Sequence, residues 1–245
     1  MSALFLIAFG APSSATIAFV NATAASDNSG TNDATLALPA LSVTTGNALV
    51  VATSAVANGG TWPPTSITDT AGNTFNLIVT GSWDASDNVS CYLALNVTGN
   101  ASDVITTNFN GAWNFAAMVA AQYSGAATSS AVDTSFVGSN SGTQGTTHTT
   151  NAFTTTNAND ALVVVDRILF NNNQTFTAGA GYTLEASDAA AQQIALEDKI
   201  VSATQSGVTA SVTYSASVGW EMCGIALKQA AAGGNNNLML LDVGR

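Results

Sequence analysis

A short segment in the first half of the chain returns in modified form in the second half, and this repeat constrains the fold more than any other feature. Asn47-Ala48-Leu49-Val50-Val51 reappears as Asp160-Ala161-Leu162-Val163-Val164, and residues 113–118 resemble residues 220–225. A fixed order of similar segments is typical of a duplicated structural unit. The sequence therefore predicts two copies of one unit.

Each copy consists of short apolar runs separated by clusters of Asn, Gly, Asp and Ser, a pattern typical of β-strands joined by tight turns. No segment has a convincing helical period; residues 187–201 come nearest, and we interpret them as a strand. The sequence predicts an all-β protein. The predicted strands cover residues 16–22, 35–38, 48–57, 74–79, 89–97, 103–109, 113–123, 146–155, 161–170, 182–186, 192–201, 208–214 and 220–228.

We expect a jelly-roll-like β-sandwich built from two pseudo-repeats, with two tandem sandwiches as the alternative. The predicted units are an N-terminal arm (1–13), pseudo-repeat 1 (14–127), pseudo-repeat 2 (128–229) and a flexible C-terminal tail (230–245). Residues 126–145 are rich in Ser, Gly and Thr and read as a linker, pinned by Val132 and Phe136. Residues 161–165 are apolar on both faces of a strand, so we expect the other repeat or a neighbouring subunit to cover the outer face.

Both ends of the chain carry short apolar segments. Residues 4–9 suggest a signal peptide, but no Lys or Arg precedes them, and we interpret residues 1–13 as a retained arm. In the tail, an Ala/Gly/Asn spacer precedes an apolar patch that we expect to dock on the chain's own body or on a partner. The patch comprises Leu238, Met239, Leu240 and Leu241.

Charge composition excludes two classes of partner. The 245 residues include 4 Lys+Arg and 15 Asp+Glu, for a formal net charge of −11. Four cations are too few to neutralise a nucleic-acid backbone or to form a basic patch on an anionic membrane. No apolar stretch reaches the length of about 20 residues that spans a bilayer. We therefore expect neither nucleic acid nor membrane as a partner.

The sequence contains no recognisable catalytic or cofactor-binding motif. Cys91 and Cys223 lie in apolar runs, where we expect buried free thiols, with a single long-range bridge as the alternative. His148 is the only histidine, and its Thr-rich surroundings predict a solvated residue on an edge-like strand. No Gly-x-Ser-x-Gly segment surrounds any serine, so a histidine-dependent triad is not predicted. We expect no enzyme activity and no cofactor.

Charged residues interrupt three strands of the second copy. Glu197 and Glu221 are candidates for the paired carboxylates of a glycoside hydrolase, if they face one groove. The alternative is a salt-bridge cluster in which Arg167 and Lys199 neutralise these carboxylates. The cations lie within one residue of acidic residues in the sequence, which favours the salt-bridge cluster.

Two further loops contain weaker candidate sites. Asp27 and Asp33 flank a run of oxygen-bearing side chains around a glycine, a composition that permits a Ca²⁺ site but is also that of a plain polar turn. Trp62 and Trp83 lie in predicted loops, where an exposed indole stacks on sugar rings in glycan-binding proteins. The alternative for Trp62 is packing on the adjacent prolines.

Three blocks of sequence resemble a loose group of β-sandwich proteins found in tailed-phage virions and among bacterial surface proteins. The first block runs from residue 16 through Thr45-Gly46-Asn47-Ala48-Leu49-Val50-Val51, with Asn47 where the group usually has Asp. The others are Thr68-Asp69-Thr70-Ala71-Gly72-Asn73-Thr74-Phe75 and Ala120-Ala121-Gln122-Tyr123-Ser124-Gly125. The resemblance spans roughly residues 14–229 and brings no active site with it.

The resemblance implies a non-enzymatic structural role. We expect a capsid decoration or fibre-like component of a virion, assembled in the host cytoplasm as a homo-oligomer with other virion or capsid proteins. Apolar contacts of the arms and of edge strands would hold such an assembly. The alternative is a carbohydrate-binding or adhesin module at a bacterial cell surface, with a cell-surface glycan as its partner.

Overall fold

The computed structural model describes residues 15–27, 33–57, 61–82, 87–138, 144–168, 174–188 and 194–231. All regular elements among these residues are β-strands, and every pairing is antiparallel. The all-β prediction is confirmed. The predicted arm (1–13), the apolar patch of the tail (Leu238, Met239, Leu240 and Leu241) and Trp83 lie outside the described residues.

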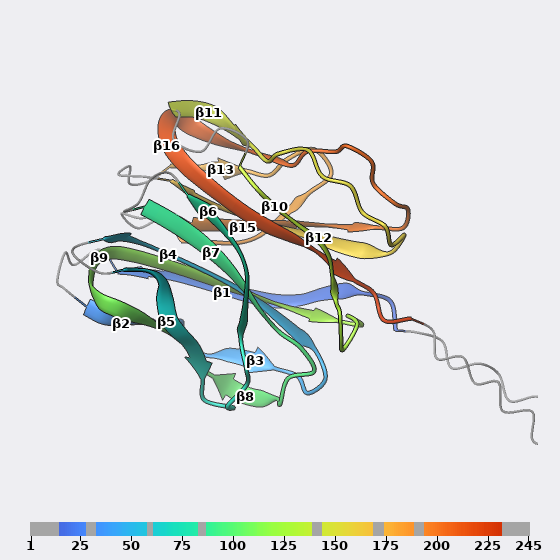
Figure 1. Cartoon of the computed structure of the whole chain (residues 1–245), viewed down its shortest axis with the longest axis horizontal. Helices are drawn as coiled ribbons and strands as arrows, with labels where there is room; N and C mark the ends of the chain where they lie inside the picture. The colour runs from blue at the N-terminus through green and yellow to red at the C-terminus, as the bar shows by residue number, and fades with distance from the viewer. Residues whose placement is uncertain are drawn as a thin grey trace, which may run out of the picture.

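Each copy of the repeat forms one seven-stranded sheet (Figure 1). The path of the first sheet is β1 (Ala18–Asp27), β9 (Ile105–Ser124), β4 (Ala48–Ala57), β7 (Asp87–Ala94) and β6 (Asn76–Ser82), and β2 (Asp33–Ala37) and β5 (Thr61–Asp69) also pair with β9. The path of the second is β10 (Val132–Val137), β16 (Ser211–Lys228), β12 (Asp160–Ile168), β15 (Ile194–Val201) and β14 (Thr183–Asp188), and β11 (Gln144–Thr149) and β13 (Phe176–Thr177) also pair with β16. Strands β3 (Leu41–Val43) and β8 (Asn100–Asp103) form a separate pair.

The two sheets have the same strand order: β1, β9, β4, β7 and β6 correspond in turn to β10, β16, β12, β15 and β14. Hydrogen-bond register gives the residue correspondence: Ala55 on β4 pairs with Ala116, whereas its counterpart Ile168 on β12 pairs with Trp220. Trp220 therefore corresponds to Ala116. The predicted match of residues 113–118 to residues 220–225 is therefore wrong by three positions.

The two sheets pack face to face, and each also has an outer layer on its far side (Figure 1). The outer layer of repeat 1 includes β2, β3, β5 and β8; that of repeat 2 includes β11 and β13. Strands β9 and β16 are long enough to serve both layers: their C-terminal halves lie in the central sheets and their N-terminal halves pair with outer strands.

This arrangement explains the strands that are apolar on both faces. Val163 and Val165 lie in the core shared by the two sheets, whereas Leu162 and Val164 lie in the outer core of repeat 2. The expectation that the other repeat covers one face of residues 161–165 is confirmed. The second face is covered by the outer layer of the same repeat.

Several segments differ from the sequence prediction. Strands β3 and β13 were not predicted, and the strands predicted separately at 103–109 and 113–123, and at 208–214 and 220–228, are the single strands β9 and β16. The predicted linker at residues 126–145 contains β10, which joins the edge of the second sheet, and Phe136 of that strand stacks on Phe153 with ring centroids 4.0 Å apart. Residues 61–69 form β5 although they include Pro63 and Pro64. Both prolines lie within the register shift between Thr61 and Ser66, where the ladder to β9 is interrupted.

The four edge strands of the central sheets, β1, β6, β10 and β14, each contain a register shift. The shifts fall at Val20 in β1, Ile78 in β6, Asp133 in β10 and Glu185 in β14. A bulge bends a strand and interrupts its row of backbone donors and acceptors, which hinders another chain from pairing with it. The edges of the two central sheets are therefore poor surfaces for strand addition.

The first and last described segments meet at one end of the sandwich (Figure 1). The backbone N–H of Ile17 donates to Oε1 of Gln229 at 3.2 Å, and the N–H of Ala230 donates to the carbonyl of Gly125 at 2.8 Å. We call this end of the molecule, comprising residues 15–17, 125–127 and 229–231, the terminal pole.

Candidate functional site

Glu197 and Glu221 do not share a groove. Glu221 on β16 points into the space between the two sheets, where it contacts Arg167. Glu197 on β15 points into the outer layer of repeat 2, where its Oε2 accepts a hydrogen bond from the backbone N–H of Gly179 at 2.8 Å. Both carboxylates are buried. The glycoside-hydrolase hypothesis required these two groups in one open groove, and this placement does not meet that requirement.

Arg167 forms a buried ionic cluster between the two repeats. Its Nη1 lies 2.7 Å from Oε1 of Glu221 on the neighbouring strand, and its Nη2 lies 3.5 Å from Oδ1 of Asp87 on β7 of the other sheet. The salt bridge predicted for Arg167 is confirmed and joins the two copies. Lys199 differs from the prediction, since its Nζ lies over the ring of Tyr182, 5.6 Å from the ring centroid.

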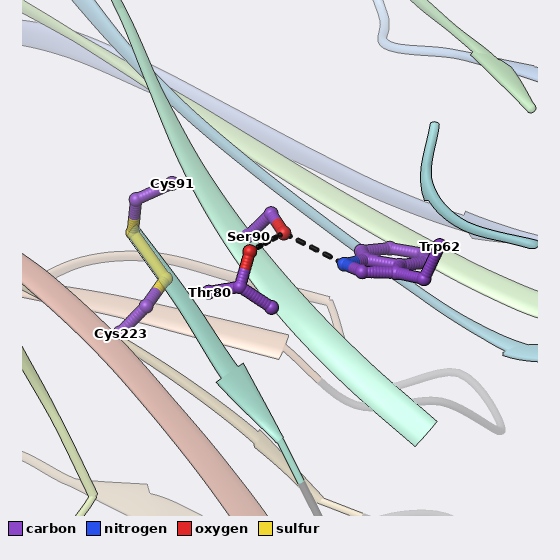
Figure 2. Close-up of a disulfide and its surroundings, with 5 residues drawn as sticks. All are labelled: Trp62, Thr80, Ser90, Cys91 and Cys223. Atoms are coloured by element: carbon purple, nitrogen blue, oxygen red, sulfur yellow. Dashed lines mark hydrogen bonds between the residues drawn. A yellow bond between two sulfur atoms is a disulfide. The ribbon is translucent and has the colours of Figure 1, made fainter. Parts of the chain in front are cut away.

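Cys91 and Cys223 form a disulfide between β7 of the first sheet and β16 of the second (Figure 2). The preferred interpretation as free thiols is wrong, and the alternative of one long-range bridge is correct. Both half-cystines lie in the shared core and are almost fully buried. The two cysteines meet because β7 and β16 face each other across that core, a relationship between copies that local sequence patterns do not reveal.

His148 is fully buried, which contradicts its prediction as a solvated surface residue. It lies on β11 of the outer layer, and its side chain points toward the central sheet, where Nδ1 is 2.7 Å from Oδ2 of Asp166. Its ring stacks on Trp220 and lies against Tyr214, with centroid distances of 4.6 and 4.5 Å. The prediction failed because the Thr-rich strand is only partly solvated: its inward face closes the outer core.

The histidine–carboxylate pair is not arranged as a nucleophilic dyad. Nε2 of His148, the nitrogen that would face a serine or cysteine in such a dyad, lies 3.3 Å from the backbone carbonyl oxygen of Gly145. Both ring nitrogens therefore face oxygen acceptors. The doubly protonated imidazolium makes both contacts as hydrogen bonds, whereas the neutral ring can donate only one.

Glu197 and Asp166 lie on the same face of the second sheet, as diagonal neighbours on β15 and β12. Burial raises the pKa of Glu197 to about 7, and the nearby Asp166 and Asp198 add to the rise. Burial also raises the pKa of Asp166, although His148 and Tyr214 oppose this shift. We call the buried set His148, Asp166, Glu197, Tyr214 and Trp220 the histidine cluster.

Of the two tryptophan candidates, the structure describes Trp62 but not Trp83. Trp62 lies in strand β5 rather than a loop; its Nε1 donates to Oγ of Ser90 at 2.7 Å, and Ser90 shares a further hydrogen bond with Thr80 (Figure 2). The Trp62 ring packs edge-on against Trp113 with centroids 5.4 Å apart. It is half-buried, and a glycan contact there stays a prediction.

The proposed Ca²⁺ loop is described only at its ends. Asp27 ends β1 and Asp33 begins β2, while residues 28–32 between them lie outside the described part of the chain. Within the described ranges, no three His, Cys, Asp or Glu side chains are grouped so that they could hold a metal ion.

Comparison with protein-family models, curated proteins and solved structures finds no match to this chain. Among the residues that the structure describes, no helix has the length and apolar character needed to cross a membrane.

Proposed function

We propose that the chain is a non-enzymatic structural protein of a tailed-phage virion, a capsid decoration or fibre-like component that acts through oligomeric assembly. The resemblance of residues 14–229 to virion β-sandwich proteins supports this role. The structural observation that carries the proposal is the terminal pole: both ends of the described body leave it side by side, joined by the Ile17–Gln229 hydrogen bond.

The terminal pole holds both the first and the last described residues, so the two terminal segments continue from the same end of the described body. Residues 4–9 and the patch of Leu238, Met239, Leu240 and Leu241 are each separated from the pole by only a few residues. An extended chain covers at most about 3.5 Å per residue, so both segments can reach one neighbouring surface within roughly 25 Å of the pole. A subunit with all its attachment segments at one pole suits attachment to a shell or a fibre.

Assembly through the arms is favoured over assembly through strand edges. The bulges at Val20, Ile78, Asp133 and Glu185 interrupt all four edge strands of the central sheets. Pairing of these strands with another subunit would require the bulges to be removed. We therefore assign the intersubunit contacts to the terminal segments and omit the edge strands that the sequence alone suggested.

The covalent link between the repeats supports a location outside the reducing cytosol. Disulfides persist in oxidising surroundings, such as the exterior of a virion or a bacterial surface. The Cys91–Cys223 bridge fixes the two sheets across their shared core. This rigidity suits a protein that is exposed for long periods after assembly.

Light scattering of the purified full-length chain tests the proposal. We expect a stable oligomer, and we expect a variant with Leu238, Met239, Leu240 and Leu241 all changed to Ser to be a folded monomer of the same secondary structure. A matched control changes the exposed Leu77 and Leu184 on β6 and β14 to Ser and should leave the oligomer intact. A full-length chain that stays monomeric would overturn the proposal and favour the glycan-binding alternative.

A further inference from the structure

Three polar side chains meet in the core shared by the two sheets. Asp198 on β15 is 4% exposed and lies against the hydroxyl group of Tyr123 on β9 and the carboxyl group of Glu185 on β14. Tyr123 is fully buried, whereas Glu185 is half-buried on an edge strand of the second sheet. We call Tyr123, Glu185 and Asp198 the seam triad, because it joins the repeats where β1 and β9 lie against β14 and β15.

The strand registers explain how the three side chains come together. Asp198 is paired with Val163 and faces the shared core, to which Val163 belongs. Glu185 is the extra residue at the register shift of β14, and a bulge of this kind re-aims a side chain. Tyr123 belongs to the shared core and reaches the two carboxyl groups from the other repeat.

The equivalent positions of the two repeats are apolar. The matched registers equate the seam triad with three aliphatic residues: Glu185 with Ile78, Asp198 with Leu93 and Tyr123 with Leu227. All three aliphatic residues pack in the same shared core. The fold therefore does not require polar groups at these positions, and the presence of oxygen at all three in the seam triad calls for another explanation.

The seam triad lacks the partners that two adjacent carboxyl groups need. Neither Oδ2 of Asp198 nor the hydroxyl oxygen of Tyr123 has a hydrogen-bond partner among the described residues. Burial and the nearby Asp198 raise the pKa of Glu185 to about 7. Above this pH two negative charges therefore lie side by side, one of them in an apolar core, which is costly without a compensating cation.

The basic residues of the described chain lie elsewhere. Their contacts and positions are as follows: Arg167 with Asp87 and Glu221, Lys199 over the ring of Tyr182, and Lys228 opposite Asp160 in the ladder of β12 and β16. None of them contributes to the pKa shifts of the seam triad. The charge of the two carboxylates is therefore left for a cation from solution.

We propose that the seam triad binds a hard divalent cation, Ca²⁺, which clamps the two repeats together. Its three side chains offer only oxygen, the donor atom that Ca²⁺ takes. Two bidentate carboxylates supply about half of the roughly six to eight oxygens around Ca²⁺, and water at the half-buried Glu185 supplies others. So few protein ligands predict weak binding, with a Kd of about 10⁻⁴–10⁻³ M, as in extracellular Ca²⁺ modules.

Thermal unfolding of the full-length chain at pH 8 tests the site, after treatment with EDTA and exchange into buffer without chelator. About 10 mM CaCl₂ should raise the melting temperature by roughly 3–10 °C above that in NaCl of equal ionic strength, because Ca²⁺ at many times its Kd stabilises the folded state. The NaCl reference removes the effect of screening the net charge of −11. Equal melting temperatures in the two salts would overturn the proposal.

Two charge-matched double variants locate the cation. Glu185→Gln/Asp198→Asn removes both carboxylates of the seam triad and should abolish the Ca²⁺-dependent shift. Asp27→Asn/Asp33→Asn changes the net charge by the same amount at the other candidate Ca²⁺ loop and should keep the shift. A folded seam-triad variant that keeps the full shift, or a loop variant that loses it, would overturn the assignment.

The single variant Glu185→Gln keeps the test decisive if the double variant fails to fold. Glu185 is half-buried, and its amide replacement leaves no charge beside Asp198. Without Ca²⁺ at pH 8 this variant should melt at or above the temperature of the wild type, and with Ca²⁺ it should lose most of the shift. A full Ca²⁺-dependent shift in Glu185→Gln would place the cation elsewhere.

Discussion

Arg167 and Glu221 form an ion pair in the interior of the protein, with Nη1 and Oε1 2.7 Å apart and both side chains fully buried. Arg167 also reaches Asp87 on the other sheet. The guanidinium thus lies where the two repeats meet. It is close to the disulfide, because on β12 and β16 the Arg167–Glu221 pair is two positions from the Val165–Cys223 pair. The shared core is therefore held by an ionic contact and a covalent bond as well as by apolar packing.

We expect Arg167→Met to destabilise the protein by about 3–5 kcal/mol, because it leaves the carboxylates of Glu221 and Asp87 buried without their cation. Urea unfolding measures this loss. The double variant Arg167→Met/Glu221→Met should recover a large part of it, since the second substitution removes one uncompensated charge. A single variant that costs less than about 1 kcal/mol, the size of an exposed pair, would show that the cluster is not buried in solution.

Replacement of the Cys91–Cys223 disulfide by two alanines should lower the free energy of unfolding by about 2–5 kcal/mol, because the bridge closes a loop with a sequence separation of 132 residues. Urea unfolding without reductant measures the change, and intact mass before and after reduction of the unfolded wild type confirms the bridge. The native wild type should resist alkylation and mild reductant since both sulfurs are buried. Rapid alkylation of native, unreduced protein at both cysteines would contradict the bridge.

Gly224→Ala should destabilise the second sheet by roughly 1–3 kcal/mol through overpacking. A Cβ at Gly224 would overlap the ring of Phe136 on β10 and lie 2.7 Å from the carbonyl oxygen of Val163. The control is Gly145→Ala, whose added Cβ would make only an ordinary contact at 3.5 Å. Thermal unfolding compares the two, and equal melting temperatures would show that Phe136 does not cover Gly224.

The free energy of unfolding should decrease as the pH rises from about 5 to 8. Burial raises the pKa of Glu185 and of Glu197 from 4.5 to about 7. A carboxyl group whose pKa is raised by folding stabilises the fold fully at pH values below its unfolded value, and this contribution is lost as the pH rises through its folded value. Differential scanning calorimetry should show the melting temperature falling over this range.

The variant Glu185→Gln/Glu197→Gln should flatten this pH profile and melt above the wild type at pH 8. Asp133 acts in the opposite direction, because hydrogen bonds from Thr156 and Asn157 lower its pKa despite partial burial. Its contribution is lost only below about pH 4, so it does not mask the decline toward neutral pH. A melting temperature that rises between pH 5 and pH 8 would contradict the assignment of raised pKa values.

Local sequence patterns predicted the strands and the burial of both faces, but missed the segments that break simple rules. The burial of both faces of residues 161–165 was predicted correctly, because apolar side chains at successive positions of a strand cannot all face one core. Strand β5 was missed because Pro63 and Pro64 argue against a strand, and the register shift that accommodates them is not visible in sequence. Strand β10 was missed because it lies within residues 126–145, a segment rich in Ser, Gly and Thr.

The sites could be predicted only where the interacting residues lie close in sequence or on adjacent strands. Arg167 and Glu221 are cross-strand neighbours on strands whose pairing follows from the repeat. The Cys91–Cys223 bridge and the His148–Asp166 contact each join different layers, so their partners depend on how those layers stack. One signal was available for His148: Asp166 interrupts a strand that is apolar on both faces, and a buried carboxylate requires a partner.

The packing of the two sheets has an implication for the origin of the chain. Strand β1 lies against β14, and its counterpart β10 lies against β6, the counterpart of β14. Exchanging the copies thus reproduces the contact, which is the relation between the two subunits of a symmetric homodimer. A single copy would expose its half of the shared core to water, so a one-copy ancestor would have existed as an obligate dimer. The two halves produced as separate polypeptides should therefore still find each other and reassemble.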